Sequence, residues 1–489
     1  MGCDKNTVDT ERILARLAGA GARIARDADD AEVVLINTCG FIDAAKEESV
    51  ETILDAVRLK NEGRLRAVVA MGCLVQRYQA DLAREIPEVD LFLGLTEVER
   101  LVPELRSRGL IDERAANMAV PLRLLATRTR HTSFLKVSEG CDHGCAFCAI
   151  PLMRGKHRST PIDILVREAQ ELEAAGVVEL NLVSQDTTWY GRDLVRGEDP
   201  FPAEYFVGRP FATMAGASSA PAAWQPKPSI RSPDRSASGT HDARRGLLPD
   251  LLRTLLRETA VPWFRLFYMY PSGITRDLVD LMAAERRIVP YLDMPIQHGA
   301  DTMLQRMRRP ERQATIRERV HWLRESIPDI ALRTTVIAGF PGETDVEFET
   351  LLELLEEICF DQLGAFPYSV EEGTPAATMP DPVEEDIKRE RLERLIDLQR
   401  TITLERNEAR VGRCETVLID RVEGRDMDDP DAPLGLRGAV GRTARQAIEV
   451  DGVVHIAAAG DVVPGKFVDA CVTGALEDDL IAERIGVAR

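Results

Sequence analysis

Short apolar runs alternate with amphipathic stretches in the first part of the chain. The apolar runs at residues 31–37 and 67–72 flank a stretch with a helical period at residues 44–59. A strand, a helix and a second continuously apolar strand are typical of a parallel sheet covered by helices on both faces. We therefore predict a doubly wound α/β domain over residues 1–125.

The same alternation returns after a polar, arginine-rich connection. Helical patterns there alternate with four apolar runs, at residues 133–137, 178–183, 263–268 and 332–338. Repeated strand-helix units of this length indicate a parallel (β/α) barrel, complete or partial. We predict this barrel over residues 126–406, with a long charged helix at about 384–406 as its last element.

One segment interrupts the barrel pattern. Residues 196–245 contain seven prolines between Pro200 and Pro233 and a run of small residues at 215–220. Such a composition buries too little apolar surface to offset the entropy lost on ordering. We therefore expect a disordered insertion at 196–245.

The last part of the chain has a different pattern. Three short strands, at residues 417–420, 453–456 and 467–472, are separated by Gly, Pro and Asp. This spacing is typical of a small antiparallel β-barrel, which we predict over residues 407–489.

Composition narrows the class of protein. The 489 residues include 62 Lys and Arg against 81 Asp and Glu, a formal net charge of −19, so we expect no stable nucleic-acid binding through a generally basic surface. No stretch approaches the ~20 apolar residues that span a bilayer, and the first residues lack the apolar run of a signal peptide. We expect a cytoplasmic protein without membrane association.

Three cysteines fall at equivalent places in the first domain. Cys39 and Cys73 directly follow the two predicted strands, and Cys3 precedes an amphipathic helix. Ligands of open α/β sheets bind at the carboxyl ends of the strands, so we expect these thiols to converge. Only Met1 and Gly2 precede Cys3, which indicates a truncated first strand or a start codon further upstream.

Three further cysteines, Cys141, Cys145 and Cys148, form a C-x3-C-x2-C triplet directly after an apolar strand. Three thiolates in one loop can bind three irons of a four-iron cluster and leave the fourth iron open for a chelating ligand. Zinc is the main alternative, with His143 as a fourth ligand. Because His143 lies inside the loop, we interpret it as a solvated residue and favour the cluster.

The remaining cysteines have no partners at metal-binding spacing. Cys359, Cys414 and Cys471 lie in apolar surroundings, and we interpret them as small core residues. The stretch at residues 303–309 carries three arginines and is interpreted as a solvated helix face or an anion contact.

With Phe147 before its last cysteine, the triplet resembles the hallmark of the radical S-adenosylmethionine (SAM) enzymes. The resemblance implies a partial (β/α) barrel in which SAM chelates the open iron and is cleaved to a 5′-deoxyadenosyl radical. Strand ends of such a barrel carry the active-site loops. Candidate SAM contacts are polar or glycine residues at or beside the strands, for each of which a structural hydrogen bond is an equal alternative: Ser184, Gln185, Arg265, Gln297, Arg333 and Gly339.

The segments at residues 2–9, 37–42 and 71–74 resemble the amino-terminal domain of methylthiotransferases. This resemblance implies that Cys3, Cys39 and Cys73 hold a second four-iron cluster, and that the final barrel is TRAM-like. Residues 150–159 and 184–188 are similar to the subgroup that modifies an aspartate of small-subunit ribosomal protein number twelve. A second subgroup modifies an adenosine in transfer RNA.

The resemblance therefore implies methylthiolation of the β-carbon of that aspartate, with SAM as radical source and methyl donor. The implied partners are the ribosomal protein and a reductant such as flavodoxin or ferredoxin. Residues 407–489 carry 10 Lys and Arg against 16 Asp and Glu, which suits a basic protein partner as well as it suits a solvated acidic surface. The alternatives are methylthiolation of transfer RNA and a non-catalytic iron-sulfur electron carrier.

Overall fold

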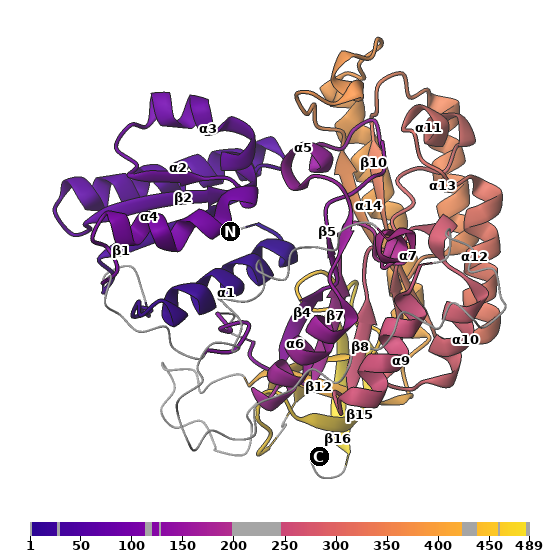
Figure 1. Ribbon diagram of the computed structural model, residues 1–489. Coiled ribbons are helices and arrows are strands. Elements are labelled where there is room, and N and C mark those ends of the chain that lie inside the picture. Colours follow the sequence, from indigo (N-terminus) through magenta and orange to yellow (C-terminus); the bar gives the residue numbers. More distant parts are fainter. Residues whose placement is uncertain are drawn as a thin grey trace, which may run out of the picture.

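The computed structural model describes residues 2–26, 30–112, 120–126, 129–197, 246–422, 438–457 and 460–485. These residues form an N-terminal sheet with its helices, a larger central sheet and a C-terminal closed barrel (Figure 1). The predicted α/β architecture is confirmed. Almost all of the predicted insertion lies outside the described residues. Of the described helices, none is long and apolar enough to cross a membrane.

The N-terminal sheet has three parallel strands in the order β1-β2-β3. Alternate side chains of β2 face opposite ways: Val68 and Ala70 pack against α2 and α3, whereas Val69 and Met71 pack against α1 and α4. Helices thus cover both faces, as the apolar strands predict. The elements are α1 (Asp4–Gly19), β1 (Val33–Thr38), α2 (Asp43–Asn61), β2 (Ala67–Gly72), α3 (Cys73–Glu85), β3 (Leu91–Leu93), η1 (Leu95–Arg100) and α4 (Leu101–Ser107). No strand precedes α1 among the described residues.

The central sheet is an open, six-stranded parallel sheet in the order β11-β10-β9-β8-β7-β4, a partial barrel. Its strands alternate with helices, and these helices pack on one face of the sheet to form a single large apolar cluster. The strands are β4 (Thr132–Lys136), β7 (Glu179–Val183), β8 (Trp263–Leu266), β9 (Ile288–Asp293), β10 (Ala331–Ala338) and β11 (Gln362–Pro367). The helices are α5 (Ile150–Arg154), α6 (Ile162–Ala174), η2 (Thr187–Trp189), α7 (Arg192–Arg196), α9 (Leu248–Glu258), η4 (Pro271–Gly273), α10 (Arg276–Ala284), α11 (Asp301–Arg306), α12 (Gln313–Ser326), α13 (Asp345–Ile358), η5 (Pro375–Thr378) and α14 (Glu385–Glu408).

Two short strands stand apart from this sheet. β5 (Ser138–Glu139) pairs antiparallel with β6 (Arg158–Ser159). The pair brackets the predicted cysteine triplet and α5, so both ends of that segment are held at one place.

The C-terminal barrel closes in the order β12-β13-β14-β16-β15. Its strands are β12 (Cys414–Val422), β13 (Ala439–Thr443), β14 (Val454–Ala457), β15 (Phe467–Ala475) and β16 (Leu480–Ile485). The prediction of an antiparallel barrel holds for four of the five pairings, because β14 and β16 run parallel.

The interpretation of the scattered cysteines as small core residues is wrong, because Cys414 is exposed and Cys471 is only half-buried. Cys414 and Cys471 stand opposite each other on β12 and β15 and form a disulfide. Cys359 is half-buried and ends α13 in a left-handed conformation, so it is a helix cap rather than a core residue. Pairing between strands that lie 57 residues apart leaves no trace in local spacing.

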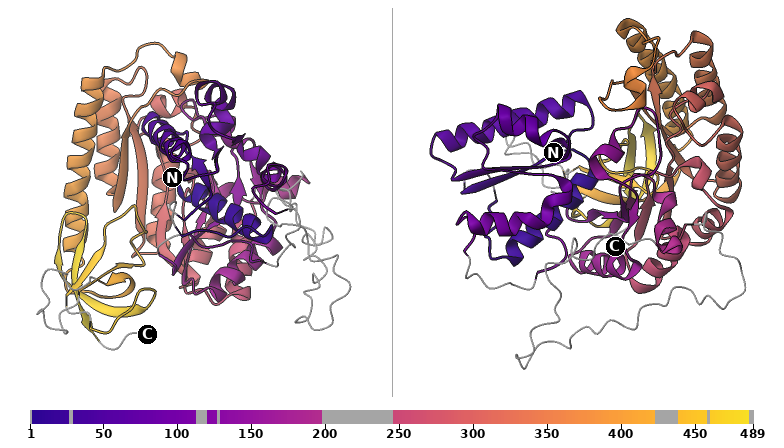
Figure 2. Two further views of the ribbon diagram at one scale, coloured as in Figure 1. Left: turned by 90° about the vertical axis from the view of Figure 1, so that its left-hand side faces the viewer. Right: turned by 45° about the horizontal axis from the view of Figure 1, so that its top comes forward.

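The C-terminal barrel lies beneath the central sheet, at the foot of α14 (Figure 2). It covers the sheet face that the helices leave free, where Trp263 and Tyr291 share an apolar cluster with Leu418 and Ala447. Phe467 adds a ring contact to Trp263 at 4.9 Å between centroids. The lower part of this face is therefore filled, and the strand ends above it remain for a site.

Candidate functional site

The cysteine loop, residues 140–148, is held rigidly by its backbone. Gly140 has φ +72°, and a Cβ there would stand 2.1 Å from the carbonyl oxygen of Lys156. The Cys141 N–H donates to the carbonyl of Gly155 at 3.0 Å, and the Ala146 N–H donates to that of Met307 at 2.9 Å. Only glycine fits at position 140, since any side chain would collide with backbone.

The three thiols of this loop are buried or half-buried, and none of them forms a disulfide. Burial raises the pKa of Cys148 to about 12 and also raises that of Cys141, and the neighbouring thiols push both in the same direction. A buried thiolate needs a compensating positive charge, which a bound metal provides. The donor set therefore fits an iron-sulfur cluster.

His143 is not a solvated residue, so that part of the sequence interpretation is wrong. Its side chain is only 8% exposed, and its Nε2 lies 2.6 Å from Asp186 Oδ2. The ring stacks on Tyr270 at 4.2 Å and contacts Trp189 at 4.0 Å between centroids. Among the described residues, no three His, Cys, Asp or Glu side chains are arranged to hold a single metal ion.

Arg309 contradicts the interpretation of residues 303–309 as a solvated helix face. It is 2% exposed, and its Nη1 lies 3.8 Å from Cys145 Sγ. Its guanidinium stands over the Tyr270 ring at 3.9 Å and pairs with Glu311. A buried positive charge therefore stands beside one of the three thiols. The neighbouring Arg308, by contrast, is exposed, as the interpretation expected.

The N-terminal cysteine set, Cys3, Cys39 and Cys73, gathers at one edge of the N-terminal sheet. Cys39 directly follows β1, Cys73 begins α3, and Cys3 directly precedes α1. Burial raises the pKa of Cys73 to about 12; the nearby guanidinium of Arg154 lowers it, and Cys3 and Cys39 raise it further. The three thiols thus lie close enough to influence one another's charge.

Asn6 stands at the centre of this set and is a residue that sequence reasoning missed. Its Oδ1 lies 3.7 Å from Cys73 Sγ, and its Nδ2 donates to the carbonyl of Thr38, the neighbour of Cys39. Asn37 in turn donates to the carbonyl of Asn6. The segment at residues 2–9 contains Asn6, but a single asparagine there carries no metal-binding signature.

The N-terminal cysteine set and the cysteine loop face a common seam between the two domains. Cys73 shares an apolar cluster with Ala149 and Met153, which lie just beyond Cys148. Near Cys3, the Lys5 ammonium stands 3.1 Å from the centroid of the Tyr268 ring, which follows β8. Residues far apart in the sequence are thus brought to one region.

Four of the six candidate SAM contacts follow strands of the central sheet. Ser184 and Gln185 follow β7, Gln297 lies beyond β9, and Gly339 follows β10. Ser184 Oγ lies 2.5 Å from Ser138 Oγ, next to the cysteine loop. Both polar atoms of the Gln185 amide are buried without a hydrogen-bond partner within the described part of the chain. Such a group calls for a partner that is not part of the protein.

The other two candidates, Arg265 and Arg333, are already paired. Arg265 Nε donates to Glu179 at 2.8 Å, and its Nη1 donates to the carbonyl of Ala444 in the C-terminal barrel. Arg333 pairs with Asp293 at 3.1 Å and with Asp451 of the barrel at 3.4 Å. These contacts favour the structural alternative for both arginines.

Comparison with known families agrees with this arrangement. Residues 1–94 match the model "Uncharacterized protein family UPF0004", residues 235–355 match "Radical SAM superfamily", and residues 411–485 match "TRAM domain". The partial parallel barrel with a three-cysteine loop defines a radical SAM enzyme, whose cofactors are a four-iron cluster and SAM. Among solved structures, the chain partly resembles the radical SAM methyltransferase TsrM from Kitasatospora setae, 13% identical, with a TM-score of 0.47 over 71% of this chain and 65% of that one.

Three relatives are alike over almost their whole length, and each is named ribosomal protein uS12 methylthiotransferase RimO. They come from Desulforudis audaxviator (40% identity, 99% of this chain, 95% of the relative), Anaeromyxobacter sp. strain K (41%, 98%, 91%) and Geobacter sulfurreducens (40%, 99%, 97%). The chain belongs to this family of radical SAM methylthiotransferases. The resemblance seen in the sequence is thereby confirmed.

Proposed function

We propose that this enzyme transfers a methylthio group to the β-carbon of an aspartate in ribosomal protein uS12. The observation that carries the proposal is the identity of about 40% over nearly the full length to relatives named for that activity. The C–H bond at the target carbon is only very weakly acidic, which makes its removal by a side-chain base at neutral pH difficult. Hydrogen abstraction by a radical does not depend on that acidity.

Cys141, Cys145 and Cys148 are the proposed ligands of the radical-generating cluster. When bound, that cluster and SAM supply the one-electron chemistry that removes an unactivated hydrogen. The chain holds the loop through Gly140 and shields two of its thiols from water. Arg309 places a guanidinium nitrogen 3.8 Å from Cys145 Sγ, beside one of the proposed ligands.

We further propose that Cys3, Cys39 and Cys73 hold a second four-iron cluster. Support comes from their gathering at the seam that faces the cysteine loop and from the carbonyl oxygen and amide of Asn6 between them. The domain boundaries at residues 125 and 406 remain predictions that accompany this assignment.

The SAM contacts are proposed at the strand ends of the central sheet. Gln185 is the strongest candidate because its buried amide has no other partner in the described part of the chain. Ser184, Gln297 and Gly339 stay candidates as neighbouring strand-end residues. Arg265 and Arg333 stay predictions only, since their guanidinium groups already pair with carboxylates.

Docking of the basic ribosomal protein is proposed to involve the acidic C-terminal barrel. Some of its charges are already used at the contact with the central sheet, where Arg442 pairs with Glu179 and Arg445 pairs with Asp361. Flavodoxin or ferredoxin is the proposed reductant, and the cytoplasm, where ribosomal proteins are made, is the proposed site of action.

The deciding experiment incubates the anaerobically reconstituted protein with SAM, reductant and either uS12 or transfer RNA. Mass spectrometry should find the methylthio group on the uS12 peptide and none on nucleosides. Modified nucleosides would favour the transfer-RNA activity instead. Absence of both products and of 5′-deoxyadenosine would favour an electron carrier.

Iron and sulfide analysis tests the second cluster separately. The wild-type protein should hold about eight iron atoms, and a variant with Cys3, Cys39 and Cys73 all changed to Ala should hold about four. The remaining electron paramagnetic resonance signal should respond to SAM. About four irons in both proteins would contradict the second cluster and leave the radical-generating one.

A further inference from the structure

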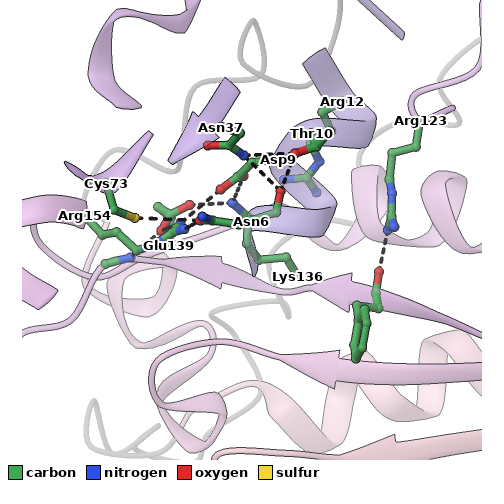
Figure 3. A network of polar contacts seen from close by, with 12 residues as sticks. Asn6, Asp9, Thr10, Arg12, Asn37, Cys73, Arg123, Lys136, Glu139 and Arg154 are labelled. Atoms are coloured by element: carbon green, nitrogen blue, oxygen red, sulfur yellow. Dashed lines mark hydrogen bonds and ion pairs between the residues drawn. The ribbon is translucent and has the colours of Figure 1, made fainter. Parts of the chain in front are cut away.

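Four buried charged side chains form a closed ring between the N-terminal and central domains (Figure 3). Lys136 contacts Asp9 and lies 2.5 Å from Glu139, while Arg154 Nη1 lies 3.1 Å from Asp9 and 2.8 Å from Glu139. Three of the side chains are 1–2% exposed and Glu139 is 11% exposed. Positive and negative charges alternate around the ring, so its formal charge is zero.

Arg154 extends the ring to the N-terminal cysteine set. Its second nitrogen, Nη2, donates to Asn6 Oδ1 at 2.6 Å, and the same oxygen lies 3.7 Å from Cys73 Sγ. Figure 3 shows Arg154, Asn6 and Cys73 pointing toward one another. The Arg154 guanidinium is therefore linked to the Cys73 thiol through Asn6, with which both of them make a hydrogen bond.

The same ring also holds both ends of the cysteine loop. Glu139 lies two residues before Cys141, and Arg154 ends α5, the helix that follows Cys148. The hydrogen bond from the Cys141 N–H to Gly155 closes the loop at that point. A shift of Arg154 would thus be felt at both cysteine sites.

We propose that Arg154 is a positioning residue that holds the cysteine loop against the N-terminal cysteine set and supplies the buried positive charge beside Cys73. The inference rests on the proposed second cluster and adds the residue that sets its position and charge environment. Asp9, Lys136 and Glu139 fix Arg154 in turn.

Two physical consequences follow from this role. A positive charge near an iron-sulfur cluster favours the reduced, more negative state, so its loss lowers the reduction potential. Loss of one charge from a buried, balanced set also leaves an uncompensated partner, which destabilises the fold. The first effect depends on proximity to Cys73, whereas the second does not.

The test uses the full chain with Cys141, Cys145 and Cys148 changed to Ala, so that only the N-terminal cluster can be loaded. Into this parent we place Arg154→Gln, Arg154→Lys and the double change Arg154→Gln with Glu139→Gln. The matched control is Arg123→Gln. Arg123 is equally buried between the two domains and pairs with Glu11 and Glu168, on the side of the network away from Cys73 (Figure 3). Iron content, midpoint potential and thermal unfolding are measured for each protein.

We expect Arg154→Gln to shift the midpoint potential to more negative values and Arg154→Lys to restore part of the shift. Arg123→Gln should lose stability without a shift in potential. The double variant should regain stability, because the charges balance again, yet keep the lowered potential. Loss of iron from Arg154→Gln, with iron retained by Arg154→Lys and Arg123→Gln, would also support the role.

An unchanged potential in an iron-loaded Arg154→Gln variant would overturn the proposal, as would a potential that recovers together with stability in the double variant. Equal loss of iron from Arg154→Lys and from Arg123→Gln would overturn it too. Iron retention would then depend on any buried arginine between the domains and not on Arg154 in particular. An iron-free parent would instead contradict the second cluster itself.

Discussion

At the scale of single residues, burial decides which polar side chains take part in the site. Burial of a single polar residue is difficult to predict from the sequence. The two sets of three cysteines could be picked out from the sequence because cysteine is rare, because the second set has a metal-binding spacing, and because two cysteines of the first set follow predicted strands. His143 and Arg309 were misread because their polar chemistry is usually solvated, whereas Asp186, Tyr270 and Cys145 enclose them here. Asp186 and Tyr270 lie in the segments that follow β7 and β8, far from His143 and Arg309 in the sequence, so no local pattern indicates these contacts.

Gly140→Ala should disrupt the cysteine loop. The added Cβ would meet the Lys156 carbonyl at 2.1 Å, and the left-handed backbone disfavours any side chain. We expect the reconstituted variant to lose the iron of the radical-generating cluster. Gly144→Ala is the matched control in the same loop, since no atom lies within 4 Å of its Cβ position, and it should keep its iron. Equal iron content in the two variants would refute this account of Gly140.

Ionisation of Glu179 should make the stability of the fold depend on pH in the acidic range. Burial opposes its ionisation, but Arg442 and Arg265 outweigh burial and lower its pKa from 4.5 to about 2. Because the folded pKa is the lower one, its stabilising contribution is present above pH 4.5 and is lost as the pH falls toward 2. Thermal unfolding across that range should show the loss, and Glu179→Gln should flatten this part of the profile.

The same variant should also destabilise the protein at neutral pH by about 3 kcal/mol, because two buried guanidinium groups would lose their carboxylate. The control is Glu357→Gln, which breaks an exposed pair with Arg317 and should cost less than about 1 kcal/mol. Similar losses in both variants would show that burial does not distinguish the two pairs.

At the scale of elements, the strands predicted from continuous apolar runs between turn residues are present in the structure, whereas β9, β11, β13 and β16 were not predicted. β2 matches its predicted run, β1 and β10 differ by one or two residues, and the strand ends carry the cysteines and Ser184 as expected. The parallel pairing of β14 with β16 was missed, because a barrel closes through contacts between strands that are distant in sequence. The ion pairs that join the elements were missed for the same reason.

Glu371, in the segment after β11, should help hold the N-terminal domain in place. Its Oε2 accepts from Lys46 of α2 at 2.9 Å and from Arg77 of α3 at 2.8 Å, and its side chain is 5% exposed. Glu371→Gln leaves these two cations without their carboxylate and should destabilise the protein by about 3 kcal/mol. Hydrogen exchange in α2 and α3 should rise. Glu372→Gln is the neighbouring exposed control: its carboxylate accepts a hydrogen bond from Tyr78 of α3 at 3.3 Å but has no ion pair among the described residues, so exchange there should change much less.

At the scale of the whole molecule, the net charge of −19 sets how a basic partner approaches. The sequence supplied this quantity in full, but it gave no hint that the C-terminal barrel packs on the central sheet and uses part of its charge there. Domain order can be read along a chain, whereas contacts between domains depend on surfaces built from separate segments.

Modification of uS12 should therefore weaken with salt. The Debye length falls from about 10 Å at 0.1 M to about 3 Å at 1 M ionic strength, which screens attraction between an acidic enzyme and a basic substrate. We expect kcat/KM for uS12 to fall as KCl is added, while 5′-deoxyadenosine formation without uS12 changes little. A parallel fall of both rates would point to damage of the cluster site rather than to docking.

The buried pairs beneath the central sheet make the C-terminal barrel a poor module for exchange. Arg442, Arg445 and Asp451 of the barrel pair with Glu179, Asp361 and Arg333 of the sheet. A chimera that took only the barrel from a relative would leave unmatched charges in an apolar seam unless those partners matched as well. Recombination or engineering that moves substrate recognition between relatives therefore has to transfer the barrel and its three partners together.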